Sequence, residues 1–298
     1  MKLSNKYLLS GDELSSSELN DLLELGVKLK RNRYKFSNVL CNKHLALIFD
    51  KPSLRTRMSF IVAMHELGGH IIESVVETRK SEEPEDQIRV LQGYCHAVML
   101  RLHEDDAQKR MHTVATIPVI NGLSELYHPC QTLADLMTLK EKFTSLQDLN
   151  ICYLGDGNNI LHSLLLMAPK IGVKVHYCCP NEYQPNADIV KHAKQKFPDA
   201  VIKHNDPESA VLNCQAVYTD VWTSMKFTEK NETAFEGFQV NESLMKKAAP
   251  DAVFMHCMPM LRGKEVSKTL PDQPCSVIFQ QSENRMHMQK ALLMALLG

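Results

Sequence analysis

From Ser145 to the middle of the last third of the chain, short apolar segments alternate with amphipathic ones. Strand-like segments, apolar and five to seven residues long, are LNICYL, VKVHYCC, AVIKH, AVYTDVW and AVFMHC. Helical patterns occur between them in NNILHSLLLMAPKIG and DIVKHAKQKF. Buried strands separated by helices favour parallel pairing with crossover connections. The second half of the chain is therefore predicted to form a parallel α/β layer.

The first half of the chain shows the same alternation of strand and helix patterns. A capping box from Ser15 to Glu18 opens an amphipathic helix in SSSELNDLLELGVKLKRNR, and Gly68-Gly69 end a helix in RMSFIVAMHELGG. Strand candidates are LALIF, HIIESVV, YCHAVMLRL and TIPVING. We therefore expect an α/β fold with two parallel layers, divided in the helix HPCQTLADLMTLKEKF into residues 1–132 and 133–282. The last helix, within 283–298, is expected to pack on the first half.

Charge and cysteine content narrow the function classes. The 298 residues include 34 Lys and Arg against 35 Asp and Glu, so the chain lacks the basic field that nucleic acid or an anionic membrane requires. Nine scattered cysteines and no signal-peptide pattern predict reduced thiols and a cytoplasmic protein. The most apolar segment, ILHSLLLMAPKIGV, is shorter than the roughly 20 residues of a membrane span. A small-molecule partner, with no nucleic acid and no membrane, is expected.

The stretch KPSLRTRMSF follows the strand LALIF and begins a helix. It contains three cations and three hydroxyls, which are Lys51, Arg55, Arg57, Ser53, Thr56 and Ser59. The first turn of a helix has unpaired N–H groups and partial positive charge, and an arginine fork can bind two phosphate oxygens. The pattern therefore predicts a phosphate site. A capped helix with solvated arginines is the alternative, and the chain has no nucleotide P-loop.

Two further turns carry polar groups. HPCQ places His128 and Gln131 at the start of a helix, where a lone histidine can also be structural. GDGNN follows a strand and opens a helix, but Ile160 stands where a dinucleotide-binding turn has its third glycine. This loop could instead present Asn158 or Asn159 to a substrate carboxylate.

Polar residues also follow two late strands. DVWTSM begins with Asp220, and MHCMP contains Cys257; both lie where open α/β sheets bind ligands, although a cysteine after a strand is often simply buried. HELGGH resembles a zinc motif, but its histidines are five residues apart and do not share a helical face. The sequence therefore predicts no metal site.

Six motifs, in order, resemble those of the ornithine carbamoyltransferases from Leu9 to the end of the chain. They are S-x-R-T-R, HPCQ, GDGNNILHS, D-x-W-x-S-M, HC-x-P and ENR. The resemblance implies two doubly wound parallel-sheet domains linked by two interdomain helices. The first would bind carbamoyl phosphate and the second ornithine. It also implies a homotrimer or a multiple of it, active sites near subunit contacts, and no metal or organic cofactor.

Site residues follow from the same motifs. The resemblance implies catalytic roles for Thr56, Arg101, His128 and Cys257. Implied carbamoyl phosphate contacts are Ser53, Leu54, Arg55, Thr56, Arg101, His128, Gln131, Cys257, Met258 and Arg285. Implied ornithine contacts are Asn159, Asp220, Ser224 and Met225. Carbamoyl transfer to the δ-amine would give citrulline and phosphate, a step of arginine biosynthesis, although the sequence does not fix the direction of flux.

Three positions depart from the family pattern. Leu54 replaces a common threonine, the loop RKSEEPEDQ lacks the usual glycines, and Lys226 replaces a glycine. The alternative amine substrates are putrescine, N-acylated ornithine and aspartate. Asp220 would repel the second carboxylate of aspartate. Putrescine has no α-amino or α-carboxylate group, so the intact D-x-W-x-S-M motif argues against it. Outside this reaction, the sequence also allows a non-catalytic ligand-binding relative, or a nicotinamide-dependent dehydrogenase suggested by GDGNN alone.

Overall fold

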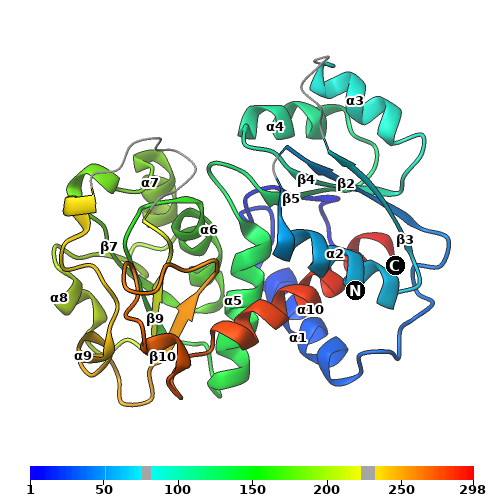
Figure 1. Cartoon of the computed structure of the whole chain (residues 1–298). Helices are drawn as coiled ribbons and strands as arrows, with labels where there is room; N and C mark the ends of the chain where they lie inside the picture. The colour runs from blue at the N-terminus through cyan, green and yellow to red at the C-terminus, as the bar shows by residue number, and fades with distance from the viewer. Residues whose placement is uncertain (51, 76–81, 223–231) are drawn as a thin grey trace. The chain divides into compact units, whose positions relative to one another are not determined.

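The structure is a computed structural model that describes residues 1–50, 52–75, 82–222 and 232–298. The chain forms two compact units: unit 1 comprises Met1–Met137 and Asn284–Gly298, and unit 2 comprises Thr138–Glu283. Each unit contains a five-stranded sheet, and all the paired strands run parallel (Figure 1). The α/β fold with two parallel sheets, predicted from the alternation of strands and helices, is confirmed.

Unit 1 has a sheet with the strand order β1-β5-β4-β2-β3. The strands are β1 (Tyr7–Leu8), β2 (His44–Phe49), β3 (His70–Val75), β4 (Ala97–Arg101) and β5 (Val119–Leu123). The helices are α1 (Ser16–Arg31), α2 (Leu54–Glu66), α3 (Pro84–Leu91) and α4 (Asp105–Val114). Ile88 of α3 and Met111 of α4 join the core formed by β2 and β4. Helices α3 and α4 thus cover one face of the sheet, and α2 lies on the other side (Figure 1).

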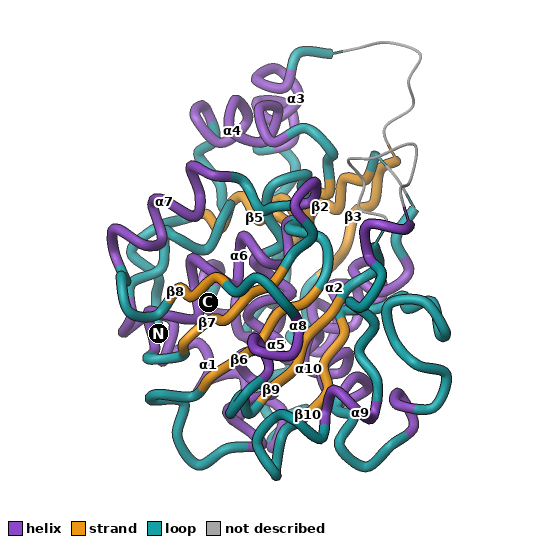
Figure 2. Tube along the Cα trace, turned by 90° about the vertical axis from the view of Figure 1, so that its left-hand side faces the viewer, coloured by secondary structure: helices purple, strands orange, loops and turns teal. Residues whose placement is uncertain are grey.

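Unit 2 has the strand order β8-β7-β6-β9-β10, which Figure 2 shows as a row. Its strands are β6 (Asn150–Leu154), β7 (Lys174–Cys178), β8 (Val201–Lys203), β9 (Ala216–Thr219) and β10 (Val253–His256). Its helices are α6 (Asn159–Met167), α7 (Ala187–Lys196), α8 (Pro207–Val211) and α9 (Glu242–Met245). Val211 of α8 and Leu244 of α9 pack with Leu154 and Phe254. Because strand side chains alternate between faces, α6 and α7 are left to cover the opposite face.

The chain passes from one unit to the other within α5 (Pro129–Lys142) and returns within α10 (Ile278–Leu297). Helix α10 begins at Ile278, earlier than the sequence pattern around Arg285 indicates. Helices α3 and α4 were not predicted, because both are short and rich in charged residues, and each buries only one or two side chains. Among the helices of the described ranges, none is both long and apolar enough to cross a bilayer.

The capping box predicted for the first helix is present. The Ser15 hydroxyl accepts a hydrogen bond from the Glu18 backbone N–H at 3.2 Å, and the Glu18 carboxylate accepts one from the Ser15 N–H at 2.9 Å. These bonds pair two groups that the start of a helix otherwise leaves to water. Leu19, Leu22 and Leu29 are buried on the inner face of this helix, as the sequence pattern predicted.

Unit 2 contains a pair of stacked histidines near one edge of its sheet. His176 Nδ1 lies 2.9 Å from His204 Nε2, and His176 Nε2 lies 3.0 Å from Asn150 Oδ1. The amide oxygen can only accept, so His176 Nε2 carries the proton and Nδ1 accepts from His204. Burial, with smaller contributions from His204 and Lys174, lowers the pKa of His176 to about 4.

This histidine is expected to make the fold acid-labile. In the unfolded chain it binds a proton below about pH 6.5, whereas in the fold it stays neutral down to about pH 4. Stability is therefore lost as the pH falls from about 6.5 to 4 and is unaffected above that window. Urea unfolding at pH 7 and pH 5 should show that His176→Gln removes about 1 kcal/mol of the acid-induced loss. The exposed His192→Gln should not; equal losses in both variants would contradict the assignment.

Candidate active site

The turn between β2 and α2 presents the start of a helix. Ser53 is the N-cap of α2, with φ −145° and ψ 112°, and its side chain makes no capping hydrogen bond. The backbone N–H groups of the first helical turn have no partners within a helix, so this end of α2 suits an anion. Ser53 and Arg55 are half-buried there, whereas the Leu54 side chain is 72% exposed. Leu54 can therefore contribute its backbone N–H, but not its side chain, to ligand binding in this turn.

Thr56 lies one residue further into α2, and its hydroxyl is fully buried between two guanidinium groups. Arg101 Nη1, from the end of β4, donates to Thr56 Oγ1 at 3.1 Å. Arg285 Nη2, from α10, donates to the same oxygen at 2.8 Å. These bonds occupy both lone pairs of the hydroxyl, so its own proton remains as a donor. The arrangement combines two fixed positive charges with an oriented O–H group.

His128 and Gln131, from the turn that opens α5, border the same cluster. Arg285 Nη1 donates to Gln131 Oε1 and lies 3.5 Å from His128 Nε2. Gln131 is fixed in turn, because its Nε2 donates to Asp135 Oδ1 at 2.8 Å. Burial, and then the charges of Arg285 and Arg101, hold the pKa of His128 well below its usual value. The imidazole is therefore neutral and can donate a hydrogen bond without adding a third positive charge.

Not every residue of KPSLRTRMSF belongs to this cluster. Arg57 Nε pairs with Glu73 Oε2 at 2.8 Å on β3, and Ser59 Oγ donates to the backbone oxygen of Arg55 at 2.7 Å. These two residues serve the helix and its neighbouring strand, although not as the capped-helix alternative predicted, since Arg57 is ion-paired and Ser53 makes no capping hydrogen bond. Lys51 lies outside the described residues.

Unit 2 has a second polar cluster at the carboxyl ends of its strands. Asn158, the N-cap of α6, accepts hydrogen bonds from the Ile160 N–H at 3.0 Å and the Tyr153 hydroxyl at 3.1 Å. Its Nδ2 donates to Asp220 Oδ2 at 2.8 Å, and Cys257 Sγ donates to Asp220 Oδ1 at 2.9 Å. The carboxylate of Asp220 is thus held by an amide and a thiol, neither of which neutralises its charge.

The residue before Cys257 is fixed from both sides. His256 Nδ1 accepts from the Met258 N–H at 2.9 Å, and His256 Nε2 lies 3.3 Å from Glu265 Oε1. The His256 ring therefore carries its proton on Nε2. Met258 has a φ of 62°, a conformation that costs energy for a side chain of this kind and that clusters at functional sites.

Local backbone geometry and packing explain why glycine stands at both positions of GDGNN. Gly155 has a φ of 122°, which favours glycine. A Cβ on Gly157 would lie 2.2 Å from the backbone nitrogen of Pro185. Ile160, in the place of a third glycine, is buried in α6. The loop is therefore built for its own packing, in agreement with the failed dinucleotide fingerprint.

The predicted ornithine residues are only partly visible. Asn159 is the first residue of α6 and is half-buried, and Asp220 is buried in the cluster described above. Ser224, Met225 and the departure at Lys226 lie outside the described residues. So does the first part of the loop RKSEEPEDQ, whose end forms α3 and whose Glu85 pairs with Arg110 at 2.7 Å.

Among the described residues, one group offers donor atoms in a metal-like arrangement. Asp220, His256 and Cys257 place one such atom each within 4.8 Å of one another. The imidazole, however, is engaged by Met258 and Glu265, and the thiol donates to the carboxylate. These contacts form a hydrogen-bond network around the Asp220 carboxylate.

Sequence reasoning missed three supports of the second cluster. Tyr153 and His256 lie within strands, where the pattern shows only apolar alternation, and Glu265 has no local signal. Asn158 could have been preferred from the sequence, because an asparagine directly before a helical pattern is a capping signal. The motif offers it only as an alternative to Asn159.

Two family models together match almost the whole chain. The carbamoyl-P binding domain of aspartate/ornithine carbamoyltransferase matches residues 6–141, and the Asp/Orn binding domain matches residues 147–296. The Archaeoglobus fulgidus ornithine carbamoyltransferase is 42% identical over 302 residues, covering 98% of each chain. The Pyrococcus furiosus protein described as anabolic is 40% identical over 310 residues, covering 100% of this chain and 98% of that one.

Solved structures agree with these matches. The ornithine carbamoyltransferase of Pyrococcus furiosus has a TM-score of 0.95 at 39% identity, covering 100% of this chain and 99% of that one. The Thermus thermophilus enzyme has a TM-score of 0.91 at 40% identity, covering 99% of each chain. The resemblance inferred from the six motifs is thus confirmed over nearly the full length. This chain belongs to the aspartate/ornithine carbamoyltransferase family.

Proposed function

We propose that this protein is an ornithine carbamoyltransferase, which transfers the carbamoyl group of carbamoyl phosphate to the δ-amine of L-ornithine to give L-citrulline and phosphate. The names of its relatives support the reaction, and the two polar clusters supply groups that it needs. Unit 1 would bind carbamoyl phosphate, and unit 2 would bind ornithine.

The observation that carries this proposal is the buried Thr56 hydroxyl, held by Arg101 and Arg285. Carbamoyl phosphate is a dianion whose carbonyl oxygen becomes negative during attack. Two fixed guanidinium groups and an oriented hydroxyl match that charge better than mobile solvent does, because they need no reorganisation. The first turn of α2, with Ser53, Arg55 and the N–H of Leu54, would hold the phosphate.

His128 and Gln131 complete the carbamoyl side of the site. A neutral His128 would donate to the developing oxyanion, and the Gln131 side chain would face the carbamoyl amide. His128 accepts from Arg285 through Nε2 in the present arrangement, which leaves its ring proton on Nδ1. Oxyanion donation through Nε2 would therefore need the other tautomer, which a neutral imidazole reaches by proton exchange.

Asp220 supplies the charge that the amino acid needs. Its carboxylate would bind the α-ammonium group of ornithine, and Asn159, Ser224 and Met225 would contact the α-amino and α-carboxylate groups. Cys257, bonded to Asp220, would lie near the reacting δ-amine, with Met258 beside the carbamoyl group. The side-chain network through Asn158 would keep the carboxylate in place.

The chemical step requires a neutral nucleophile. The δ-amine resembles a lysine amine, with a pKa of about 10.4, so roughly one molecule in a thousand is neutral near pH 7.4. The cations around Thr56 disfavour a second ammonium and so favour the reactive form. The nitrogen lone pair attacks the carbonyl carbon, the C–O bond to phosphate then breaks, and the leaving phosphate takes the amine proton. Positioning and electrostatics supply the acceleration, with no metal or organic cofactor.

The same proposal extends to assembly and cellular role. We infer a homotrimer or a multiple of it, a cytoplasmic location, and a role in arginine biosynthesis. The anabolic relative supports the last of these. Sedimentation of the purified protein would test the trimer.

Detection of ureido product tests the function. The purified protein is incubated with carbamoyl phosphate and, separately, ornithine, putrescine, N-acetylornithine or aspartate. Product with ornithine alone is expected, since Asp220 offers a counter-charge to an α-ammonium and repels an extra carboxylate. Product with another amine would keep the reaction and reassign the substrate. No product with any of them would support a non-catalytic ligand-binding protein.

A further inference from the structure

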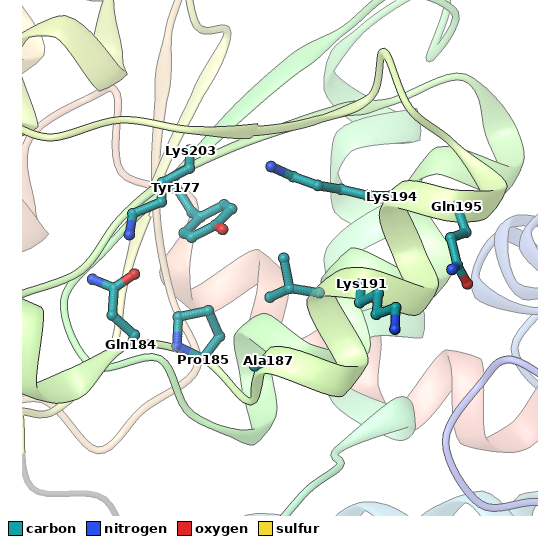
Figure 3. A pocket seen from close by; sticks show the side chains of 9 residues that line it. Tyr177, Gln184, Pro185, Ala187, Lys191, Lys194, Gln195 and Lys203 are labelled. Carbon is teal, nitrogen blue, oxygen red and sulfur yellow. The ribbon is translucent and has the colours of Figure 1, made fainter.

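Unit 2 contains a cavity of about 620 Å³, open at the surface, that the proposed reaction does not use. It lies between helix α7 and strands β7 and β8 (Figure 3). Tyr177, near the end of β7, and Lys203, the last residue of β8, line it from the sheet. Its volume falls in the range of small-molecule sites, and carboxyl ends of parallel strands are where open α/β sheets bind ligands.

The Tyr177 hydroxyl is an unused polar group at this cavity. The residue is only 2% exposed, and its hydroxyl has no hydrogen-bond partner within the described ranges. The hydroxyl oxygen itself reaches the surface of the cavity, where it can donate a hydrogen bond to a ligand. Figure 3 shows this hydroxyl facing the space between the strands and α7. Burial raises the pKa of Tyr177 to about 12, so the group remains a donor.

The charged residues that line the cavity are all positive. Lys191 and Lys194 line it from α7, and Lys203 lines it from β8. No ion pair of these three lysines is found in the part of the chain that the structure describes, and no carboxylate is among the lining residues there. Figure 3 shows the Lys194 side chain extending from the helix toward the strands. These three exposed lysines give the cavity a positive potential, which favours an anion.

The rest of the lining is mostly apolar. Pro185, Ala187 and Val190 contribute apolar surface to the lining. An inorganic anion would leave this surface unused, whereas a ligand with a flat apolar body would cover it. The combination of a polar edge and an apolar wall is typical of sites for organic ligands.

We propose that this cavity binds a small organic anion, whose aromatic or apolar body packs on Pro185 and Val190. Its phosphate or carboxylate group lies between Lys194 and Lys203 and accepts the hydrogen bond of Tyr177. The site is separate from the two clusters assigned to carbamoyl transfer. Phosphate and carboxylate have the same charge-assisted chemistry here, and experiment distinguishes them.

Fluorescence titration of the intact protein with 1-anilinonaphthalene-8-sulfonate tests the site, since this probe joins an aromatic body to an anionic group. Saturable binding of one molecule per chain is expected. The double variant Lys194→Met, Lys203→Met should weaken it at least about tenfold, and Tyr177→Phe about threefold to fivefold. Displacement by adenosine monophosphate would identify a phosphate ligand, and displacement by 2-naphthoate a carboxylate.

Matched controls separate binding from folding. The double variant Lys246→Met, Lys268→Met removes the same charge from exposed positions of unit 2 and should bind the dye as the wild type does. Tyr177→Phe should not lower the unfolding free energy of the unliganded protein, because the hydroxyl has no partner to lose among the described residues. Non-saturable dye binding, unchanged affinity in the cavity variants, or failure of both competitors to displace the dye would each overturn the proposal.

Discussion

Replacement of Arg285 by methionine is expected to lower kcat/KM for carbamoyl phosphate by about 10³-fold. The guanidinium holds the Thr56 hydroxyl at 2.8 Å and the Gln131 amide, and it supplies one of the two positive charges beside that hydroxyl. Methionine fills a similar volume but provides neither donors nor charge. Steady-state kinetics with carbamoyl phosphate varied at saturating ornithine would measure the loss.

Two further variants show what kind of loss this is. Arg285→Lys keeps the charge but not the fork, so it should recover only part of the activity. Arg262→Met removes an exposed guanidinium that pairs with Asp272, and its kinetics should match those of the wild type. Turnover within threefold of wild type in Arg285→Met would show that the Thr56 cluster is structural only.

Asp220→Asn is expected to raise the KM for ornithine about 100-fold or more, with a much smaller change in the KM for carbamoyl phosphate. The carboxylate is buried and accepts from Asn158 at 2.8 Å and Cys257 at 2.9 Å. An amide removes the counter-charge for the α-ammonium group. It also places a second NH₂ group against Asn158 unless one amide turns over.

A pair of controls isolates the charge effect. Asp199→Asn, at an exposed position of the same unit, should leave both KM values unchanged. Cys257→Ser keeps a donor to Asp220 and should retain ornithine affinity better than Asp220→Asn does. If carbamoyl phosphate affinity alone falls in Asp220→Asn, the assignment of unit 2 to the amino acid is wrong.

Local patterns predicted much of the fold. Strand and helix alternation identified both parallel sheets, and the Ser15 capping box marks the start of α1 as predicted. Helices α3 and α4 were missed, because each is short and largely charged and buries only one or two residues, so its local sequence was read as a charged connection. The start of α10 was placed too late for a related reason: IFQQSEN has little apolar periodicity, and neighbouring structure decides its conformation.

The candidate site was harder to predict, because its contacts join distant segments. Thr56 and Arg285 are 229 positions apart, and no spacing rule indicates that one hydroxyl bonds two guanidinium groups. The same holds for Asn158 and Asp220, which are 62 positions apart. Motif order could nominate the residues, whereas their pairing depends on where parallel strands end in space. The neutral state of His128 likewise follows from burial and from neighbours that the sequence does not place together.

Unit 2 is one uninterrupted stretch of chain, but unit 1 is made of two, and this has a consequence for biosynthesis. A ribosome delivers Thr56, Arg101 and His128 early, and then makes all of residues 138–283 before Arg285 appears. Domains generally fold as they emerge, N-terminal part first. Until α10 is synthesised, the first unit therefore has only one of the two guanidinium groups that hold the Thr56 hydroxyl. The Thr56 cluster cannot be completed on a ribosome-bound chain that stops short of Arg285.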